Sequence, residues 1–151
     1  NGDLDNAIKY SEKTLEVYKE LEELSNISDI ENNLGKLFYK FENIEESFKH
    51  YEISKEIRIR RKDEKIIETL INICENHIKL KNIKKCEEVL KEIHSYLKDD
   101  DIENLIEINI LWYRIFILKD DKIIKLGVNI VVIMNIIYNC LGENVRKSYK
   151  L

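Results

Sequence analysis

Apolar residues recur at spacings of three and four along most of the chain, which is the pattern of amphipathic helices. The two clearest stripes are Leu34, Phe38 and Phe41, followed by Ile44, Phe48 and Tyr51. Only Glu42-Asn43 separates them, and a connection that short favours two antiparallel neighbouring helices. The stretch 34–54 therefore predicts a helical hairpin.

The hairpin pattern returns further along the chain, in a register where Gly35 coincides with Cys74 and Ser47 with Cys86. Similar shifts toward the N-terminus and the C-terminus give further copies, and two-helix repeats of this length are typical of α-solenoids. We therefore predict an all-α fold, an α-solenoid of antiparallel helix hairpins, as a single domain over 1–151. Its expected parts are a half repeat 1–25, repeats at about 27–62, 63–98 and 100–141, and a C-terminal helical segment 143–151.

The first helix is expected to run from Leu4 to about Leu24 and to end in the polar stretch 25–28. Ser28 then has the position of an N-cap for the next helix, with Glu31 three positions on completing a capping box. Asp63 has the corresponding position before a later helix. The apolar contacts of the first helix are expected from Tyr10, Val17, Leu21 and Leu24.

The repeat resembles the tetratricopeptide repeat (TPR), whose pattern is W-x2-L-G-x2-Y followed by A-x3-F and Pro. Leu34-Gly35 and Phe38 stand at the L-G and Y positions, and Ser47 and Tyr51 stand at the A and F positions. The chain departs from the pattern at Glu31, which replaces the tryptophan, and it contains no proline. The resemblance implies a module that binds a peptide or a protein segment and has no catalytic activity.

In solenoids of this kind the first helix of each hairpin lines the inner face. Residues one step from the packing stripe are expected to point there, with amides meeting a peptide backbone and aromatic or aliphatic groups holding side chains. The lysines among them would favour an acidic group on the ligand. The predicted peptide-binding residues are Asn32, Lys36, Tyr39, Lys40, Ile71, Glu75, Ile78, Lys79, Asn109, Tyr113 and Phe116. The alternative is that they form an exposed surface without a ligand.

The truncated start and long repeats also resemble the sensor half of bacterial helix-turn-helix regulators, in which a TPR array reads a signalling peptide. That resemblance implies a fragment of a longer protein, since the chain lacks an initiator methionine and begins inside a repeat. The competing interpretation is a structural adaptor that docks one protein partner without a sensing role.

Composition excludes several other classes. The net charge is −4, so direct binding to nucleic acid is not expected, and the basic run 58–62 is interpreted as cations that complement a helix C-terminus. Three cysteines do not suggest a disulfide framework and fit a reducing cytoplasm. The sequence contains no Gly-rich phosphate loop, H-E-x-x-H, G-x-S-x-G or C-x2-C motif, so neither an enzyme nor a cofactor is expected.

Two further features have competing interpretations. Cys74, His77 and Cys86 can converge in a hairpin and are possible zinc ligands, but they occupy core positions and a fourth ligand is not obvious. The apolar run 128–141 is too short for a membrane span and carries three amides. We expect the cysteines and the histidine to be buried and metal-free, and 128–141 to pack in a homodimer or against the following segment.

Overall fold

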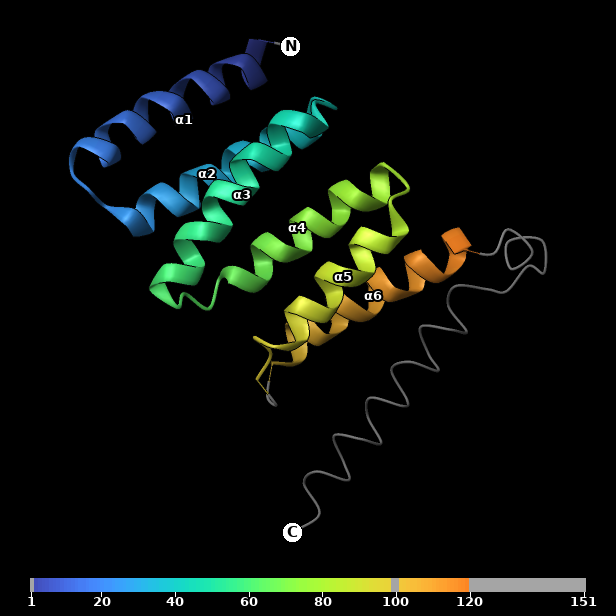
Figure 1. Ribbon diagram of the computed structural model, residues 1–151. Coiled ribbons are helices and arrows are strands. Elements are labelled where there is room, and N and C mark those ends of the chain that lie inside the picture. The colour runs from blue at the N-terminus through green and yellow to red at the C-terminus, as the bar shows by residue number, and fades with distance from the viewer. Residues whose placement is uncertain (1, 99–100, 120–151) are drawn as a thin grey trace.

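The computed structural model describes residues 2–98 and 101–119, and all regular structure there is helical (Figure 1). Six helices follow one another in these ranges, without a strand. They are α1 (Gly2–Glu20), α2 (Leu24–Lys40), α3 (Ile44–Arg61), α4 (Ile66–Lys79), α5 (Ile83–His94) and α6 (Ile102–Lys119). The prediction of an all-α chain is confirmed for this part, while the segments 128–141 and 143–151 lie outside the described residues.

Each helix packs against its neighbours in sequence, and α2, α4 and α6 also contact one another in that order. Successive helices alternate in direction, with α1 at one end of the assembly and α6 at the other (Figure 1). The core is correspondingly divided. One cluster of buried side chains centres on Leu15, Ile27 and Leu34, and a larger one extends from Tyr51 to Ile115. Most packing is therefore between helices close in sequence.

Four helices end in the same way, with a residue in the left-handed conformation directly after the last turn. Glu22, Glu42, Lys62 and Lys81 have φ values of 55°, 63°, 53° and 55°. In each case the N–H of the following residue donates to the carbonyl five positions back, as Asn43 does to Phe38 at 3.0 Å. This is the Schellman arrangement, which satisfies helix-end carbonyls and turns the chain back sharply. It explains why very short connections suffice between antiparallel helices.

The close crossing of each hairpin lies at the positions that the repeat relates to one another. In the first hairpin Ser47 Oγ donates to the carbonyl of Gly35 at 2.8 Å, and a Cβ on Gly35 would lie 2.5 Å from Cδ1 of Tyr51. In the next, Cys74 and Cys86 are fully buried and each thiol faces the other's backbone carbonyl, at 3.5 and 3.7 Å. Small side chains stand there because the backbones approach closely.

The predicted boundary of the first helix was wrong. The chain turns at 21–23, and Ser28 lies inside α2, where its hydroxyl donates to the carbonyl of Ser25 instead of capping. A left-handed Glu22 ends α1 before the polar stretch is reached. The expected cap at Asp63 was also wrong, because α4 begins at Ile66 with Lys65 as its N-cap; the Asp63 carboxylate accepts from the N–H of Lys65 in the turn ahead of the helix.

The predicted contacts of the first helix were also wrong. Tyr10, Val17, Leu21 and Leu24 are all exposed, because α1 packs on α2 through another side that includes Ile8, Leu15 and Tyr18. A stripe spaced like a core face is therefore left uncovered by the described residues.

Candidate functional site

Helices α2, α4 and α6 form a continuous seam through contacts between polar side chains. Asn72 Nδ2 donates to Asn32 Oδ1 at 3.2 Å, and Lys36 pairs with Glu68 at 2.5 Å. Further along, Lys79 lies 4.8 Å from the centre of the Tyr39 ring. Arg114 of α6 pairs with Glu75 of α4. The seam fixes the three helices side by side.

The predicted residues of α2 lie in this seam and are largely engaged. Asn32 is almost completely buried, and its amide is bonded to Glu68 at 3.1 Å as well as to Thr69 and Asn72. Lys36 is occupied by Glu68. These residues join α2 to α4, so Asn32 and Lys36 have structural partners at the positions where a ligand was expected.

Beyond that network, Lys40 is exposed, while Lys79 pairs with Glu42 at 3.3 Å. Ile78, beside Lys79 in sequence, is buried. Of the three lysines expected to receive an acidic ligand group, Lys36 and Lys79 already face carboxylates. The charge argument for an acidic ligand therefore loses most of its support.

A hollow of about 350 Å³ lies between α4 and α6 on the seam. Its lining contains Ile71 and Glu75, two of the predicted residues, together with Asn72, Glu107, Ile110 and Leu111. Aliphatic side chains meet an amide and two carboxylates there, and Glu75 is also held by Arg114. Such a hollow can accept an aliphatic side chain while the polar groups receive N–H donors.

The predicted residues of α6 lie elsewhere. Asn109, Tyr113 and Phe116 are not among the residues that line the hollow. Asn109 Nδ2 donates to the carbonyl of Leu105 at 2.8 Å, and Phe116 is exposed.

Sequence reasoning missed a buried network centred on Arg58. This guanidinium is 1% exposed and donates to Asp29 at 2.8 Å, to the carbonyl of Lys65 at 2.7 Å and to Thr69 at 2.6 Å. Glu68 lies 3.4 Å away. Arg58 therefore ties α2, α3 and α4 together, and the basic run 58–62 does not act as a unit. A carboxylate in the preceding first helix was the only available signal, and its distance along the sequence matched no helical or repeat spacing.

The network controls the ionisation of its acids. Burial alone would raise the pKa of Asp29, but hydrogen bonds from Lys65 and Arg58 and their charges lower it overall. Burial likewise opposes the lowered pKa of Glu68, which results from Lys36 and then Arg58. Both carboxyl groups are therefore held ionised.

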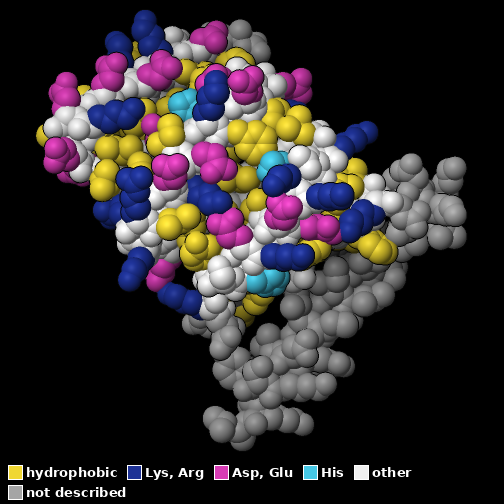
Figure 2. Space-filling model, viewed as in Figure 1, with side chains coloured by type: hydrophobic (Ala, Val, Ile, Leu, Met, Phe, Trp, Pro, Cys, Tyr) yellow, Lys and Arg dark blue, Asp and Glu magenta, His cyan; other side chains and the backbone are white. Residues whose placement is uncertain are grey.

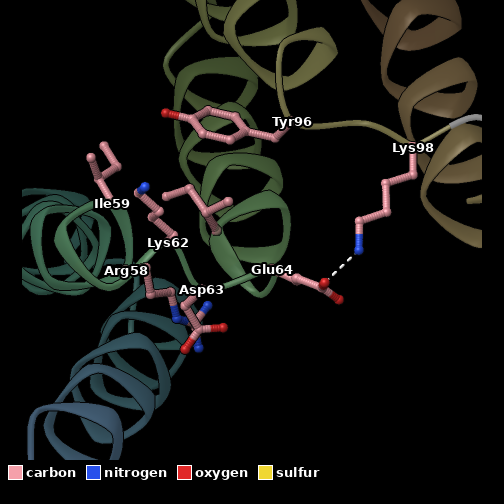
Figure 3. Close-up of a pocket in the computed structure, with 8 residues that line it drawn as sticks. Arg58, Ile59, Lys62, Asp63, Glu64, Tyr96 and Lys98 are labelled. Atoms are coloured by element: carbon pink, nitrogen blue, oxygen red, sulfur yellow. Dashed lines mark hydrogen bonds and ion pairs between the residues drawn. The ribbon is translucent and has the colours of Figure 1, made fainter.

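A second hollow, of about 330 Å³, opens at the C-terminal end of α3 (Figure 3). Arg58 and Tyr96 contribute to its lining, and an ion pair joins Lys98 to Glu64 at one side. Because the guanidinium of Arg58 is already committed to Asp29, Thr69 and Lys65, the hollow offers a ligand fewer polar groups than the residues suggest. The hollow between α4 and α6 is the stronger candidate.

Cys74, His77 and Cys86 occupy the hairpin core. The prediction of burial is confirmed for both cysteines, and His77 is partly buried against the Phe48 ring, with centroids 4.7 Å apart. The hydrogen bond with Cys86 and burial raise the pKa of the Cys74 thiol, and burial lowers the pKa of His77. Within the described ranges, no three His, Cys, Asp or Glu side chains are grouped so as to hold a metal ion.

Charge on the visible face is mixed, with acidic and basic side chains interspersed and apolar patches between them (Figure 2). No helix in the described part has the length and apolar character needed to cross a membrane. Comparison with known proteins adds no relative, since no protein-family model, curated protein or solved structure matches the chain.

Proposed function

We propose that this chain is a TPR-like solenoid of stacked hairpins that binds an extended peptide or protein segment along the α2–α4–α6 seam. The stacking is supported by the matching crossings at Gly35/Ser47 and Cys74/Cys86 and by the contacts between successive first helices. The fold assignment also rests on the resemblance of residues 34–54 to the TPR pattern.

The observation that carries the binding proposal is the hollow between α4 and α6. Ile71, Ile110 and Leu111 supply an apolar surface for one anchoring side chain. Asn72 Oδ1 has no hydrogen-bond donor among the described residues and, with Glu107, can accept N–H groups from an extended backbone. A ligand with an aliphatic or aromatic anchor beside exposed backbone amides fits this combination.

The test is selection of peptides from a phage-displayed random library on the immobilised chain, followed by titration of a selected peptide into variants. Ile110→Asp places a charge in the hollow and should weaken binding at least tenfold. Ile53→Asp is the matched control, because Ile53 is exposed on α3 and lies outside the hollow. Both variants should keep the helical circular dichroism of the parent.

Tyr113→Ala and Arg60→Ala separate this site from the surface expected from sequence. Tyr113 and Arg60 do not line the hollow, so Tyr113→Ala and Arg60→Ala should each leave binding to it within about threefold. Loss of binding with Tyr113→Ala but not with Ile110→Asp would move the site from the hollow to the surface around Tyr113. Selection of no peptide at all, with capture of a folded protein partner, would favour the structural adaptor.

A further inference from the structure

The uncovered side of α1 is a regular apolar stripe. Tyr10, Val17 and Leu21 are 69%, 53% and 61% exposed, and Thr14 lies between them. The alternating intervals of four and three place these positions along one side of the helix and its end. Such a spacing is the seam of a helix that packs against another helix.

The same register packs on a helix elsewhere in this chain. The repeat brings Tyr10, Thr14 and Val17 onto His50, Ser54 and Ile57 of α3. These three positions face α2: Ser54 Oγ donates to the carbonyl of Ser28 at 2.8 Å, His50 Nδ1 lies 2.6 Å from Glu31, and Ile57 packs on the Leu34 cluster. No helix among the described residues packs against the corresponding positions of α1, which are Tyr10, Thr14 and Val17.

We propose that a second copy of this chain covers the stripe, with the two α1 helices antiparallel about a twofold axis. In this register Thr14 lies opposite the partner's Val17, and Tyr10 lies opposite the partner's Leu21. An interface of this kind is self-complementary, so each contact occurs twice. The apolar residues are thereby removed from water in both copies.

Charge complementarity selects this occupant. Lys13 and Glu20 flank the stripe on the same side of α1, where an antiparallel arrangement places Lys13 opposite the partner's Glu20. Both are exposed, and neither forms an ion pair with any described residue. The twofold axis produces the pair twice. A parallel arrangement would set the two Lys13 side chains at one level and the two Glu20 side chains at another, so unlike charges would not meet.

The proposal is tested by sedimentation equilibrium of the full chain over a range of concentrations. The wild type should dimerise. Lys13→Glu replaces two attractive pairs by two repulsive ones and should weaken the dimer about tenfold, and Lys13→Glu/Glu20→Lys should return it to within about threefold of the wild type. Val17→Asp should give monomer, whereas the matched control Ile53→Asp should not.

Several results would overturn this assignment. They are a wild type that stays monomeric at every concentration, a dimer that Val17→Asp leaves intact, and a dimer that the charge-reversed double variant fails to restore. The double variant Ile133→Asp/Ile137→Asp tests the alternative interface through the segment 128–141. Loss of the dimer there with retention in Val17→Asp would assign the interface to the segment 128–141 instead. Circular dichroism of each variant verifies that the helices remain formed.

Discussion

Replacing Arg58 by methionine should destabilise the chain far more than any other arginine replacement on α3. Methionine keeps most of the aliphatic length but removes the guanidinium, which donates to Asp29, Thr69 and the carbonyl of Lys65. The change leaves acceptors on different elements without their donor. Arg60 is the matched control, because it is 78% exposed and lies 3.8 Å from Glu56.

The magnitude follows from burial. Removing one partner of a buried ion pair lowers the free energy of unfolding by about 3–5 kcal/mol when the other partner stays buried. Asp29 and Glu68 are 33% and 44% exposed, so water takes over part of their solvation and the cost is reduced. The carbonyl of Lys65 keeps the N–H of Thr69 at 3.4 Å, and the Thr69 hydroxyl keeps Asn32 Oδ1 at 3.3 Å, so the two groups together lose about 0.5–1.5 kcal/mol. We expect a loss of about 2–4 kcal/mol for Arg58→Met and less than about 0.5 kcal/mol for Arg60→Met.

The assay is urea unfolding followed by circular dichroism at the helix minimum and by tyrosine fluorescence. Two probes are needed because neighbouring hairpins can unfold separately in a chain whose contacts are mostly local. A loss below about 1 kcal/mol for Arg58→Met, or equal losses for the two variants, would refute the structural role given to the Arg58 network.

Three further predictions concern the same scaffold. Gly35→Ala should cost about 1–3 kcal/mol in urea unfolding, because the added Cβ meets the Tyr51 ring, and Gly35→Ala/Tyr51→Leu should recover part of it. Glu42→Gly should raise the free energy of unfolding by about 0.5–1 kcal/mol by relieving the left-handed φ; no gain in the urea midpoint would argue against strain there. Because the pKa values of Asp29 and Glu68 are lowered in the folded chain, their contribution should be complete above about pH 4.5 and lost as pH falls through the folded values. As the pH falls through that range, the free energy of unfolding measured in urea should decrease less in Arg58→Met than in the wild type. An equal dependence of this free energy on pH in the two proteins would contradict the coupling.

The periodic part of the fold could be predicted from sequence because it is local. A helical stripe can be recognised from apolar residues spaced three and four apart. The register of the repeat also predicted which residues meet at the two hairpin crossings, Gly35 with Ser47 and Cys74 with Cys86. The first boundary could not be found in the same way. Glu22 adopts a left-handed conformation without being glycine or asparagine, so no residue type marked the end of α1.

The site was harder to predict because it depends on how successive hairpins pack. The predicted repeat made Asn32, Ile71 and Asn109 equivalent, and equivalent residues were expected to line one shared groove. Equivalent positions can instead face the neighbouring helix. Asn32 thus bonds to α4, Ile71 lines the hollow beside α6, and Asn109 bonds within α6. Arg58 was hidden for a related reason, since Asp29 lies far before it in the sequence while Lys65 and Thr69 follow it.

The claim that the α2–α4–α6 seam binds a peptide is tested most directly by amide chemical-shift mapping of the ¹⁵N-labelled chain. A peptide selected on the wild type is titrated in, and perturbations are located on the helices. The account predicts saturable shifts centred on Ile71, Asn72, Glu107 and Ile110, which Ile110→Asp abolishes and Ile53→Asp preserves. Shifts centred on α3 and α5, or shifts that persist in Ile110→Asp, would contradict it.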